Sequence, residues 1–379
     1  MRICYLADAK SPHTQKWVTH FAAEGHEVHV ISFRDHEIAG VSVHHVPPPL
    51  VDSSVELLHA GRGRLQKTAY LFCARRVRRL VRQLKPDILH AFLATSYAYV
   101  GAMSGVHPFV VSSLGSEIVV LPEDSLFYRG LVRYNLRRAD AVTATSRFLS
   151  QATRRYCPPG TDPLTVAFGV DTHAFSPNGR KYVEGPATVG TVKILESNYG
   201  IDRLIMAFER VLRLRPDLDI SLLIVGGGSL EKNLKKLGHR LGISERVTFV
   251  GNLPHAKVMS FLSQIDIFAS LPESETFGVS VVEASSCAIP VVVSDVGGLP
   301  EVVRDGETGF LVPPMDIDVT AGRILELAGD AELRRRMGAA GREMVLAEYD
   351  WRSTSGRMAE LYQNLMMKTG SRSYENSAR

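Results

Sequence analysis

Cysteine, tryptophan and long apolar runs are scarce in this chain. Its 379 residues include two tryptophans and four cysteines, which are Cys4, Cys73, Cys157 and Cys287. The cysteines lie far apart without a Cys-x-x-Cys pair, so we expect neither a disulfide framework nor a cysteine-rich metal site. No apolar run approaches the ~18 residues of a membrane-spanning helix, and no signal peptide precedes the strand-like run at 3–7. These absences favour a reducing compartment: a cytoplasmic protein, or a peripheral one at the inner face of the cell membrane.

Positive charge is unevenly distributed along the chain. Residues 1–181 carry 22 Lys and Arg against 14 Asp and Glu, whereas residues 182–379 carry 22 against 26. A basic half can face a membrane, nucleic acid or an anionic ligand, or it can be a solvated surface. Because no recognised nucleic-acid module accompanies the charge, no nucleic-acid partner is expected.

Short β-branched runs alternate with stretches of helical period along most of the chain. This alternation predicts an α/β protein with parallel sheets covered by helices on both faces. A stretch rich in Pro, Gly and polar residues at 174–187 interrupts it, and a second alternating series follows. We therefore expect two Rossmann-like doubly wound domains, 1–180 and 181–365, facing each other across a cleft, and a polar tail at 366–379 that frays after about residue 370. In such sheets, ligands bind beyond the carboxyl ends of the strands.

Two carboxylates stand out in the run at 272–303. Glu275 ends a predicted strand-to-helix loop, and Glu283 lies in the middle of the following helix among apolar neighbours. The first turn of that helix, 276–279, has free backbone N–H groups that can bind a phosphate, and Glu275 beside it can meet sugar hydroxyls. Glu283 requires a partner, because an unpaired buried carboxylate is costly.

The order of the motifs in the second half resembles a known family. The pieces are GVDTHAF at 169–175, GIDRLIMAF at 200–208, IVGGGS at 224–229, VTFVGNLPH at 247–255, the Glu-x7-Glu pair, PVVVSDVGG at 290–298, PEVVRDG at 300–306 and TGFLV at 308–312. Together they resemble the retaining glycosyltransferases of family 4, also called group 1. The run SPHTQKWV at 11–18 resembles members that build capsular or other surface polysaccharides.

The resemblance implies a GT-B fold of two Rossmann-like domains, with the last helix returning to the first. It implies a nucleotide-sugar donor held mainly by the second domain. Glu283 would accept hydrogen bonds from the ribose hydroxyls, and Glu275 would lie against the donor sugar. The remaining residues implied to bind the donor are Thr276, Phe277, Gly278 and Val279 around the helix turn, and Gly226, Gly227, Asn252 and Leu253 in two loops that flank the diphosphate and base.

One of the family's usual two cations is missing here. Lys193, at the end of the first strand of the second domain, matches a cationic position of the family. The second cation usually stands just before Gly200, where this chain has Asn198-Tyr199, and Arg203 is a candidate replacement. No metal or other cofactor is expected, because Lys193 and the helix-turn N–H groups stand where the diphosphate would lie. This expectation also assumes that the chain has no Asp-x-Asp motif, which commonly holds a metal-bound diphosphate.

The first domain departs from the family in a second place. Members often carry His-Gly-Ser-Asp after the fifth strand, whereas this chain has Leu114-Gly115-Ser116-Glu117. Glu117 and His13 are therefore candidate catalytic residues beside Glu275 and Lys193. Each also has a structural interpretation: Glu117 as a helix cap and His13 as a packing residue. Ser11 is expected to cap the helix that begins with Pro12.

A strongly basic element covers residues 62–85. Its apolar residues recur at helical spacing, and Arg75, Arg78, Arg79 and Arg82 project mostly away from them. Family members that use lipid-linked acceptors often rest on anionic membranes through such helices. The alternative is the solvated outer face of a Rossmann helix.

These observations predict a retaining, metal-independent hexosyltransferase. It would move a hexose from a nucleoside-diphosphate sugar to a hydroxyl of a glycan or lipid-linked glycan, in surface polysaccharide biosynthesis. Two alternatives stay open: a nucleotide-sugar 2-epimerase on the same architecture, and a catalytically weak sugar-nucleotide-binding protein. The missing second cation favours the latter.

Overall fold

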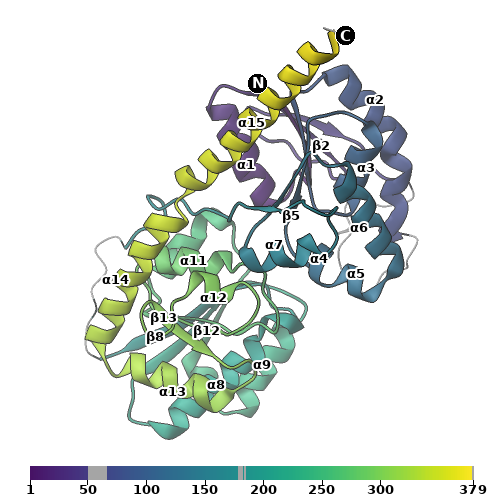
Figure 1. Ribbon diagram of the computed structural model, residues 1–379. Helices are drawn as coiled ribbons and strands as arrows, with labels where there is room; N and C mark the ends of the chain where they lie inside the picture. The colour runs from purple at the N-terminus through teal and green to yellow at the C-terminus, as the bar shows by residue number, and fades with distance from the viewer. Residues whose placement is uncertain (50–65, 178–181, 183–184, 378–379) are drawn as a thin grey trace. The chain divides into compact units, whose positions relative to one another are not determined.

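The computed structural model describes residues 1–49, 66–177, 182 and 185–377, and the chain divides into two compact units (Figure 1). Unit 1 comprises Met1–Val166 together with Ser355–Arg379, and unit 2 comprises Ala167–Thr354. The chain therefore crosses between the units twice. The expected boundary near residue 180 lies within unit 2.

Unit 1 is built on a seven-stranded parallel sheet with the order β3-β2-β1-β4-β5-β6-β7. Its strands are β1 (Arg2–Leu6), β2 (Glu27–Ser32), β3 (Ser42–His45), β4 (Ile88–Phe92), β5 (Phe109–Ser113), β6 (Ala141–Ala144) and β7 (Leu164–Thr165). In register, Ile3 of β1 pairs with Val28 of β2 and with Ile88 of β4. Strands β4 and β5 are buried at every position, as expected for central strands covered on both faces.

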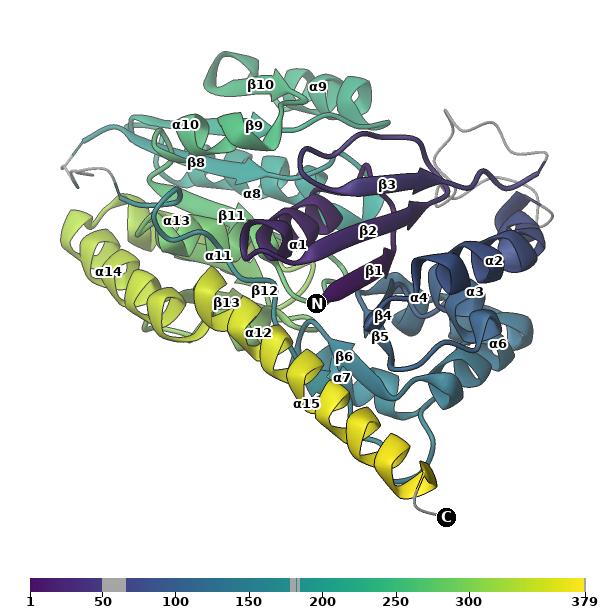
Figure 2. The ribbon, with the colours of Figure 1, turned by 90° about the horizontal axis from the view of Figure 1, so that it is seen from above.

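Helices cover both faces of the unit 1 sheet. They are α1 (Pro12–Ala23), the 3-10 helix η1 (Gln66–Cys73), α2 (Ala74–Leu84), α3 (Ser96–Ser104), α4 (Ser116–Val119), α5 (Leu121–Asp124), α6 (Leu126–Arg138), α7 (Arg147–Arg154) and α15 (Trp351–Ser377). Helices α2, α3 and α6 lie together on one side, and α1 lies with α15 on the other (Figures 1 and 2). A buried hydrogen bond of 2.6 Å between His90 Nδ1 and the Tyr362 hydroxyl anchors α15 to the sheet.

Unit 2 repeats the design with a six-stranded parallel sheet of order β10-β9-β8-β11-β12-β13. Its strands are β8 (Ala187–Val192), β9 (Ile220–Val225), β10 (Val247–Gly251), β11 (Ile267–Ser270), β12 (Val291–Ser294) and β13 (Gly309–Val312). The strand order reverses between β8 and β11, which are neighbours in the sheet. Such a switch point is where doubly wound sheets bind ligands.

Two apolar layers enclose the unit 2 sheet. The helices are η2 (Ser197–Tyr199), α8 (Ile201–Leu214), α9 (Glu231–Arg240), η3 (Ser244–Arg246), η4 (His255–Lys257), α10 (Val258–Leu262), α11 (Val279–Ser286), α12 (Leu299–Val302), α13 (Ile317–Ala328) and α14 (Ala331–Glu348). One buried cluster gathers side chains of α8, α9 and α13, the other gathers those of α10, α11 and α12, and α14 contributes to both. The two parallel sheets confirm the predicted α/β class.

Two local predictions were wrong. The carboxyl-terminal tail does not fray from residue 370, because α15 continues to Ser377. Ser11 stands at the N-cap of α1 and Pro12 opens the helix, but the Ser11 side chain makes no capping hydrogen bond. Gln15 instead ties this turn to the preceding loop, since its Nε2 donates to the Ala9 carbonyl at 3.0 Å. Across the described part of the chain, no helix combines the length and the apolar character needed to cross a bilayer.

Candidate active site

The site in unit 2 forms where β8 and β11 end side by side. Lys193 directly follows β8, and Glu275 closes the loop that follows β11. Because parallel neighbouring strands end at the same edge of the sheet, these two side chains meet. The Lys193 Nζ donates to Glu275 Oε2 at 2.6 Å, and the two side chains are 14% and 17% exposed. The ion pair thus lies at the switch point and is only partly accessible to solvent.

The carboxylate of Glu275 stays ionised at neutral pH. Burial by itself would raise its pKa, but the Lys193 charge and the backbone N–H groups of Phe277 and Thr276 outweigh burial, so the pKa lies below its usual value. The nearer of these contacts runs from the Thr276 N–H to Glu275 Oε1, at 3.0 Å. Lys193 also lies over the ring of Tyr199, 4.8 Å from its centroid. Tyr199 stands directly before Gly200, at the place where the resemblance implies a second cation.

The helix turn after Glu275 contributes backbone rather than side chains. The Phe277 ring is buried and packs against Phe168 and Tyr349, with centroid distances of 5.9 and 5.6 Å. Gly278, the N-cap of α11, has φ +96°, a conformation that suits glycine. Since the Thr276 N–H points to Glu275, the groups left to meet an anion are the N–H groups at Gly278 and Val279, which have no partner within a helix.

The glycine loop after β9 packs on the backbone of Lys193. Gly226 has φ +138°, and a Cβ at this position would lie 1.9 Å from the Lys193 carbonyl oxygen. A Cβ on Gly227 would lie 3.1 Å from the Cβ of Asn252, so the two predicted loops adjoin each other. Leu253 packs against the core cluster of α10 and α11. The glycines therefore allow the close approach that sets Lys193 at the edge.

Glu283 has the partner that its apolar surroundings demanded. It is 5% exposed, and its Oε1 lies 2.7 Å from His255 Nε2. His255 begins η4, directly after the loop that contains Asn252 and Leu253. The sequence prediction missed this histidine. The signal was the need of Glu283 for a donor, but linear spacing does not tell which residue of another loop supplies it.

Arg203 forms hydrogen bonds to the loop that leads to Glu275. Its guanidinium is buried, with Nε and Nη2 donating to the Leu271 carbonyl at 3.3 and 3.1 Å. Its Nη1 donates to Glu273 Oε1 at 2.9 Å. The Glu273 N–H in turn donates to the Asn198 carbonyl at 2.9 Å. These contacts make Arg203 a support of the β11 loop, and its predicted phosphate contact stays a prediction.

In unit 1, Glu117 is engaged by its own loop. Its two carboxylate oxygens accept from the backbone N–H groups of Leu114 at 2.6 Å and Gly115 at 2.9 Å. It is 3% exposed, and burial raises its pKa despite these hydrogen bonds. This geometry is that of a cap for α4. His13 lies in the first turn of α1 and is partly buried.

The assumption that the chain has no Asp-x-Asp motif was wrong, because the sequence contains two such triplets, at 217–219 and 316–318. Asp217 and Asp219 precede β9 and pair with Arg215 and Arg246. Asp316 caps α13, and Asp318 pairs with Arg210. Within the described ranges, no group of three or more His, Cys, Asp or Glu residues could hold a metal ion. Neither triplet adjoins the Lys193–Glu275 pair in sequence or through these contacts.

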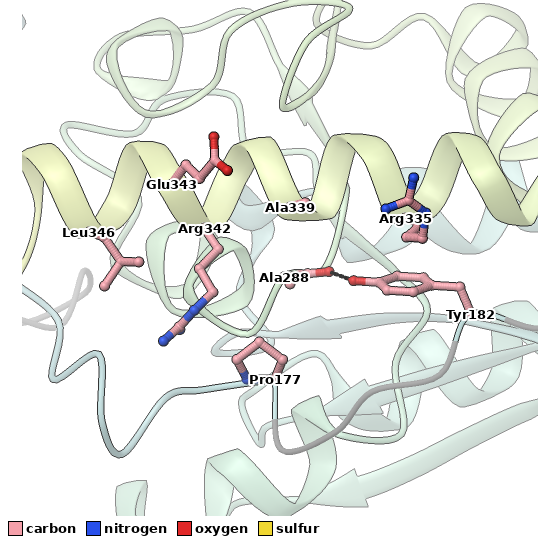
Figure 3. Close-up of a pocket in the computed structure, with 8 residues that line it drawn as sticks. All are labelled: Pro177, Tyr182, Ala288, Arg335, Ala339, Arg342, Glu343 and Leu346. Carbon is pink, nitrogen blue, oxygen red and sulfur yellow. Dashed lines mark hydrogen bonds between the residues drawn. The ribbon is translucent and has the colours of Figure 1, made fainter.

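A pocket in unit 2 lies away from this edge (Figure 3). Its lining residues are Pro177, Tyr182, Ala288, Arg335, Ala339, Arg342, Glu343 and Leu346. Ala288 precedes β12, so the pocket adjoins the amino end of that strand. Its polar groups serve the backbone: the Tyr182 hydroxyl donates to the Ala288 carbonyl, and Arg342 donates to the Ser286 carbonyl. The pocket therefore has no part in the site built around Glu275.

Solved structures of other proteins share the fold of this chain. The chain resembles sucrose-phosphate synthase of Thermosynechococcus elongatus with a TM-score of 0.80 and 21% identity, covering 97% of this chain and all of the other. It resembles HepE of Anabaena in complex with UDP-glucose with a TM-score of 0.77 and 19% identity, covering 96% and 100%. At these identities the likeness shows the fold alone. The two parallel-sheet units thus have the GT-B fold.

The family follows from sequence. Residues 175–344 match the model for glycosyl transferases group 1, and residues 2–146 match that for glycosyl transferase 4-like proteins. The chain is 31% identical over 316 residues, 76% of its length and 79% of its relative's, to the GDP-mannose-dependent alpha-(1-6)-phosphatidylinositol monomannoside mannosyltransferase of Mycolicibacterium smegmatis. The chain belongs to the group 1 glycosyltransferases.

Proposed function

We propose that this protein is a retaining glycosyltransferase that takes a hexose from a nucleoside-diphosphate sugar. The observation that carries the proposal is the ion pair of Lys193 and Glu275 beside the first turn of α11, at the carboxyl edge of the unit 2 sheet. Unit 2 would hold the donor, and unit 1 would serve the acceptor, a hydroxyl of a glycan or lipid-linked glycan in surface polysaccharide biosynthesis.

In the proposed reaction, negative charge develops beside the positively charged groups at the carboxyl edge of the unit 2 sheet. As the bond between the sugar C1 and the leaving diphosphate breaks, charge accumulates on the phosphate oxygen. The Lys193 ammonium and the N–H groups at Gly278 and Val279 would stabilise it, and such preorganised donors act most strongly in the transition state. The acceptor oxygen would bond C1 on the same face, and its proton would pass to the leaving phosphate.

Glu275 has two functions in this proposal. Its Oε2 holds Lys193 in place, and its carboxylate would accept hydrogen bonds from donor-sugar hydroxyls. The lowered pKa keeps it an acceptor at neutral pH. No metal is required, because the cation and the backbone N–H groups supply the positive charge.

The donor's base and sugar are open to a direct test. The mannosyltransferase relative is GDP-mannose-dependent, whereas HepE was crystallised with UDP-glucose. A thermal-shift screen of UDP-, GDP- and ADP-sugars identifies the donor, since a ligand at 100 times its Kd stabilises by ~2.7 kcal/mol. Products formed with and without acceptor then separate transfer from 2-epimerisation. No shift with any nucleotide sugar would contradict the proposal, and binding without turnover would favour a binding protein.

A membrane surface is the partner we propose for α2. This helix carries five exposed arginines and no acid, while Val77 and Val81 on its other face are buried. Residues 62–65 of the predicted basic element lie outside the described residues. Each basic side chain near an anionic surface contributes ~1 kcal/mol. The protein would then work at the inner face of the cell membrane.

The membrane proposal is tested by sedimentation with vesicles that contain anionic lipid. Replacing Arg75, Arg78, Arg79 and Arg82 by Gln should remove most binding, and salt should weaken wild-type binding. The matched control removes the same charge from exposed positions of α9, by changing Lys232, Lys235, Lys236 and Arg240 to Gln. Equal losses in the two variants, or equal binding to neutral vesicles, would contradict a specific role for α2.

A further inference from the structure

We propose that His255 is a positioning residue for Glu283: it fixes one carboxylate oxygen so that the other meets the ribose hydroxyls of a bound nucleotide. The inference rests on the proposed function, because it takes unit 2 as the donor-binding unit. It gives a role to His255, the last residue of the VTFVGNLPH piece, to which the sequence pattern assigned none.

The hydrogen bond between the two side chains is short and directed. His255 Nε2 lies 2.7 Å from Glu283 Oε1, within the range of charge-assisted hydrogen bonds. An ionised carboxylate can only accept, so Nε2 carries a proton whether the imidazole is neutral or charged. Among the described residues, His255 is the only side-chain partner of Glu283. The second oxygen, Oε2, is therefore available to a ligand.

His255 is itself held on a second side. Its ring lies 5.6 Å from that of Phe175, at an interplanar angle of 46°. Phe175 is buried, and its carbonyl accepts from the Ser286 hydroxyl at 2.6 Å at the end of α11. The imidazole is thus placed between a fixed aromatic ring and the carboxylate, although 55% of its side chain is exposed. A histidine that only filled space would not need this arrangement.

The location of the pair fits a ribose. Glu283 lies on the helix whose first turn follows Glu275, and His255 follows the loop of Asn252, which adjoins Gly227. A carboxylate with one anchored oxygen cannot rotate freely, so its other oxygen presents a fixed acceptor. Without His255 the Glu283 carboxylate would lose this anchor, and its hydrogen bond to a ribose hydroxyl would be weaker.

The decisive readout is discrimination between ribose and deoxyribose. Isothermal titration of the full chain measures Kd for UDP, GDP and ADP and for their 2′-deoxy and 3′-deoxy forms. We expect the wild type to bind the ribonucleotide of its preferred base about tenfold more tightly than at least one deoxy form, since a hydrogen bond to a charged group is worth about a factor of ten or more. In His255→Leu this ratio should fall towards one, while the Kd of the deoxy form stays unchanged.

Two further variants keep the test decisive. His255→Gln retains an amide donor and should keep part of the discrimination, whereas His255→Asn is shorter and should lose it even if the leucine variant does not fold. The control is His239→Leu, at an exposed histidine of α9, which should leave every Kd unchanged.

The failures of the two proposals are distinguishable. If the wild type binds no nucleotide, the proposed function is wrong. If the wild type discriminates and the His255 variants keep the ratio, or lose ribo- and deoxynucleotide affinity equally, the positioning role is overturned while the proposed function stands.

Discussion

Glu117 in unit 1 and Glu275 in unit 2 are buried glutamates in comparable places. Each follows a central strand of a parallel sheet, Glu117 inside the short helix α4 and Glu275 in the loop before α11, yet their surroundings differ. The carboxylate of Glu117 accepts from backbone N–H groups, among them those of Leu114 and Gly115, and burial raises its pKa. That of Glu275 faces Lys193 at 2.6 Å, and its pKa is lowered. Two carboxylates at carboxyl edges of parallel sheets thus have opposite pKa shifts, because the groups that face them differ.

The same contrast extends to the neighbours of each glutamate. Unit 1 has Leu114 where the family often has a histidine, and the Leu114 N–H donates to the Glu117 carboxylate at 2.6 Å. In unit 2, the glycines at 226 and 227 and the anchored β11 loop bring a cation to the carboxylate. This difference supports the proposal that unit 2 holds the donor, and variants of Glu275, Lys193 and Glu117 test it.

The largest effect is expected from Glu275→Gln. Neutralising this side chain removes a charged acceptor from the proposed sugar site and frees Lys193, so kcat should fall about 10²- to 10³-fold, as for other preorganised electrostatic groups. Steady-state kinetics on the folded variant measures it. The control is Glu273→Gln, an exposed glutamate two residues earlier. Near-wild-type turnover in Glu275→Gln would remove Glu275 from the mechanism.

Lys193→Ala should reduce kcat more than donor affinity, by about 10²-fold, because phosphate charge grows towards the transition state. The comparison of kcat with donor Kd separates the two effects. Restoring a lysine at Asn198 in this background tests whether the missing second cation can compensate. A rise in KM alone would reduce Lys193 to a binding residue.

The acid stability of unit 1 depends on His90. Burial lowers its pKa from 6.5 to about 3. Between these pH values His90 binds a proton in the unfolded chain but not in the folded chain. His90 therefore does not lower the free energy of unfolding above pH 6.5, and lowers it as the pH drops, by up to about 1.4 kcal/mol per pH unit. Glu275 has a lowered pKa, so its protonation reduces the free energy of unfolding only below about pH 4.5.

Urea unfolding at pH 7, 6 and 5 checks this prediction in wild type and in His90→Gln. The pKa values of His20, His26 and His44 are lowered too, so the wild-type slope is a sum and the variant isolates His90. The variant should show the flatter slope even if it is less stable at pH 7. Identical slopes would contradict a neutral buried His90.

Glu117→Gln should lower stability and leave kcat unchanged. Its amide nitrogen would face a backbone N–H donor in place of an acceptor, at a cost of about 1–3 kcal/mol. Denaturant unfolding and kinetics of the same preparation separate the two roles. A fall in kcat without a loss of stability would restore Glu117 as a catalytic residue.

Much of this molecule could be predicted from local pattern. These features depend on residue periodicity and turn residues, which are local properties of the sequence. They are the alternation of strands and helices, the break between the two series, and the helix that starts after Glu275. What failed depends on three-dimensional neighbours. Ser11 has the right residue type for a cap, but Gln15 ties the turn instead. His255 stands 28 residues before Glu283 in sequence, and only the fold joins them.

Arg203, whose phosphate contact stays a prediction, has partners that the sequence did not reveal. Its charge and its place near Gly200 made it a candidate for the missing cation, but the sequence does not reveal that the Leu271 carbonyl lies within reach and needs a donor. The prediction of a frayed tail was wrong for a different reason. The polar composition suggested fraying, but the tail continues α15, which begins at Trp351 and packs on unit 1 through Tyr362.

The most direct test of the central claim is the anomeric configuration of the product formed without metal. Once the donor is known, the reaction is run in EDTA and the new glycosidic bond is examined by proton NMR, where the anomeric coupling reports the configuration. Our account predicts full activity in EDTA and a product that keeps the donor's configuration, because Lys193 and the α11 turn stabilise the leaving group. An inverted product would contradict the retaining mechanism, and activity lost in EDTA but restored by Mg²⁺ or Mn²⁺ would contradict the role given to Lys193.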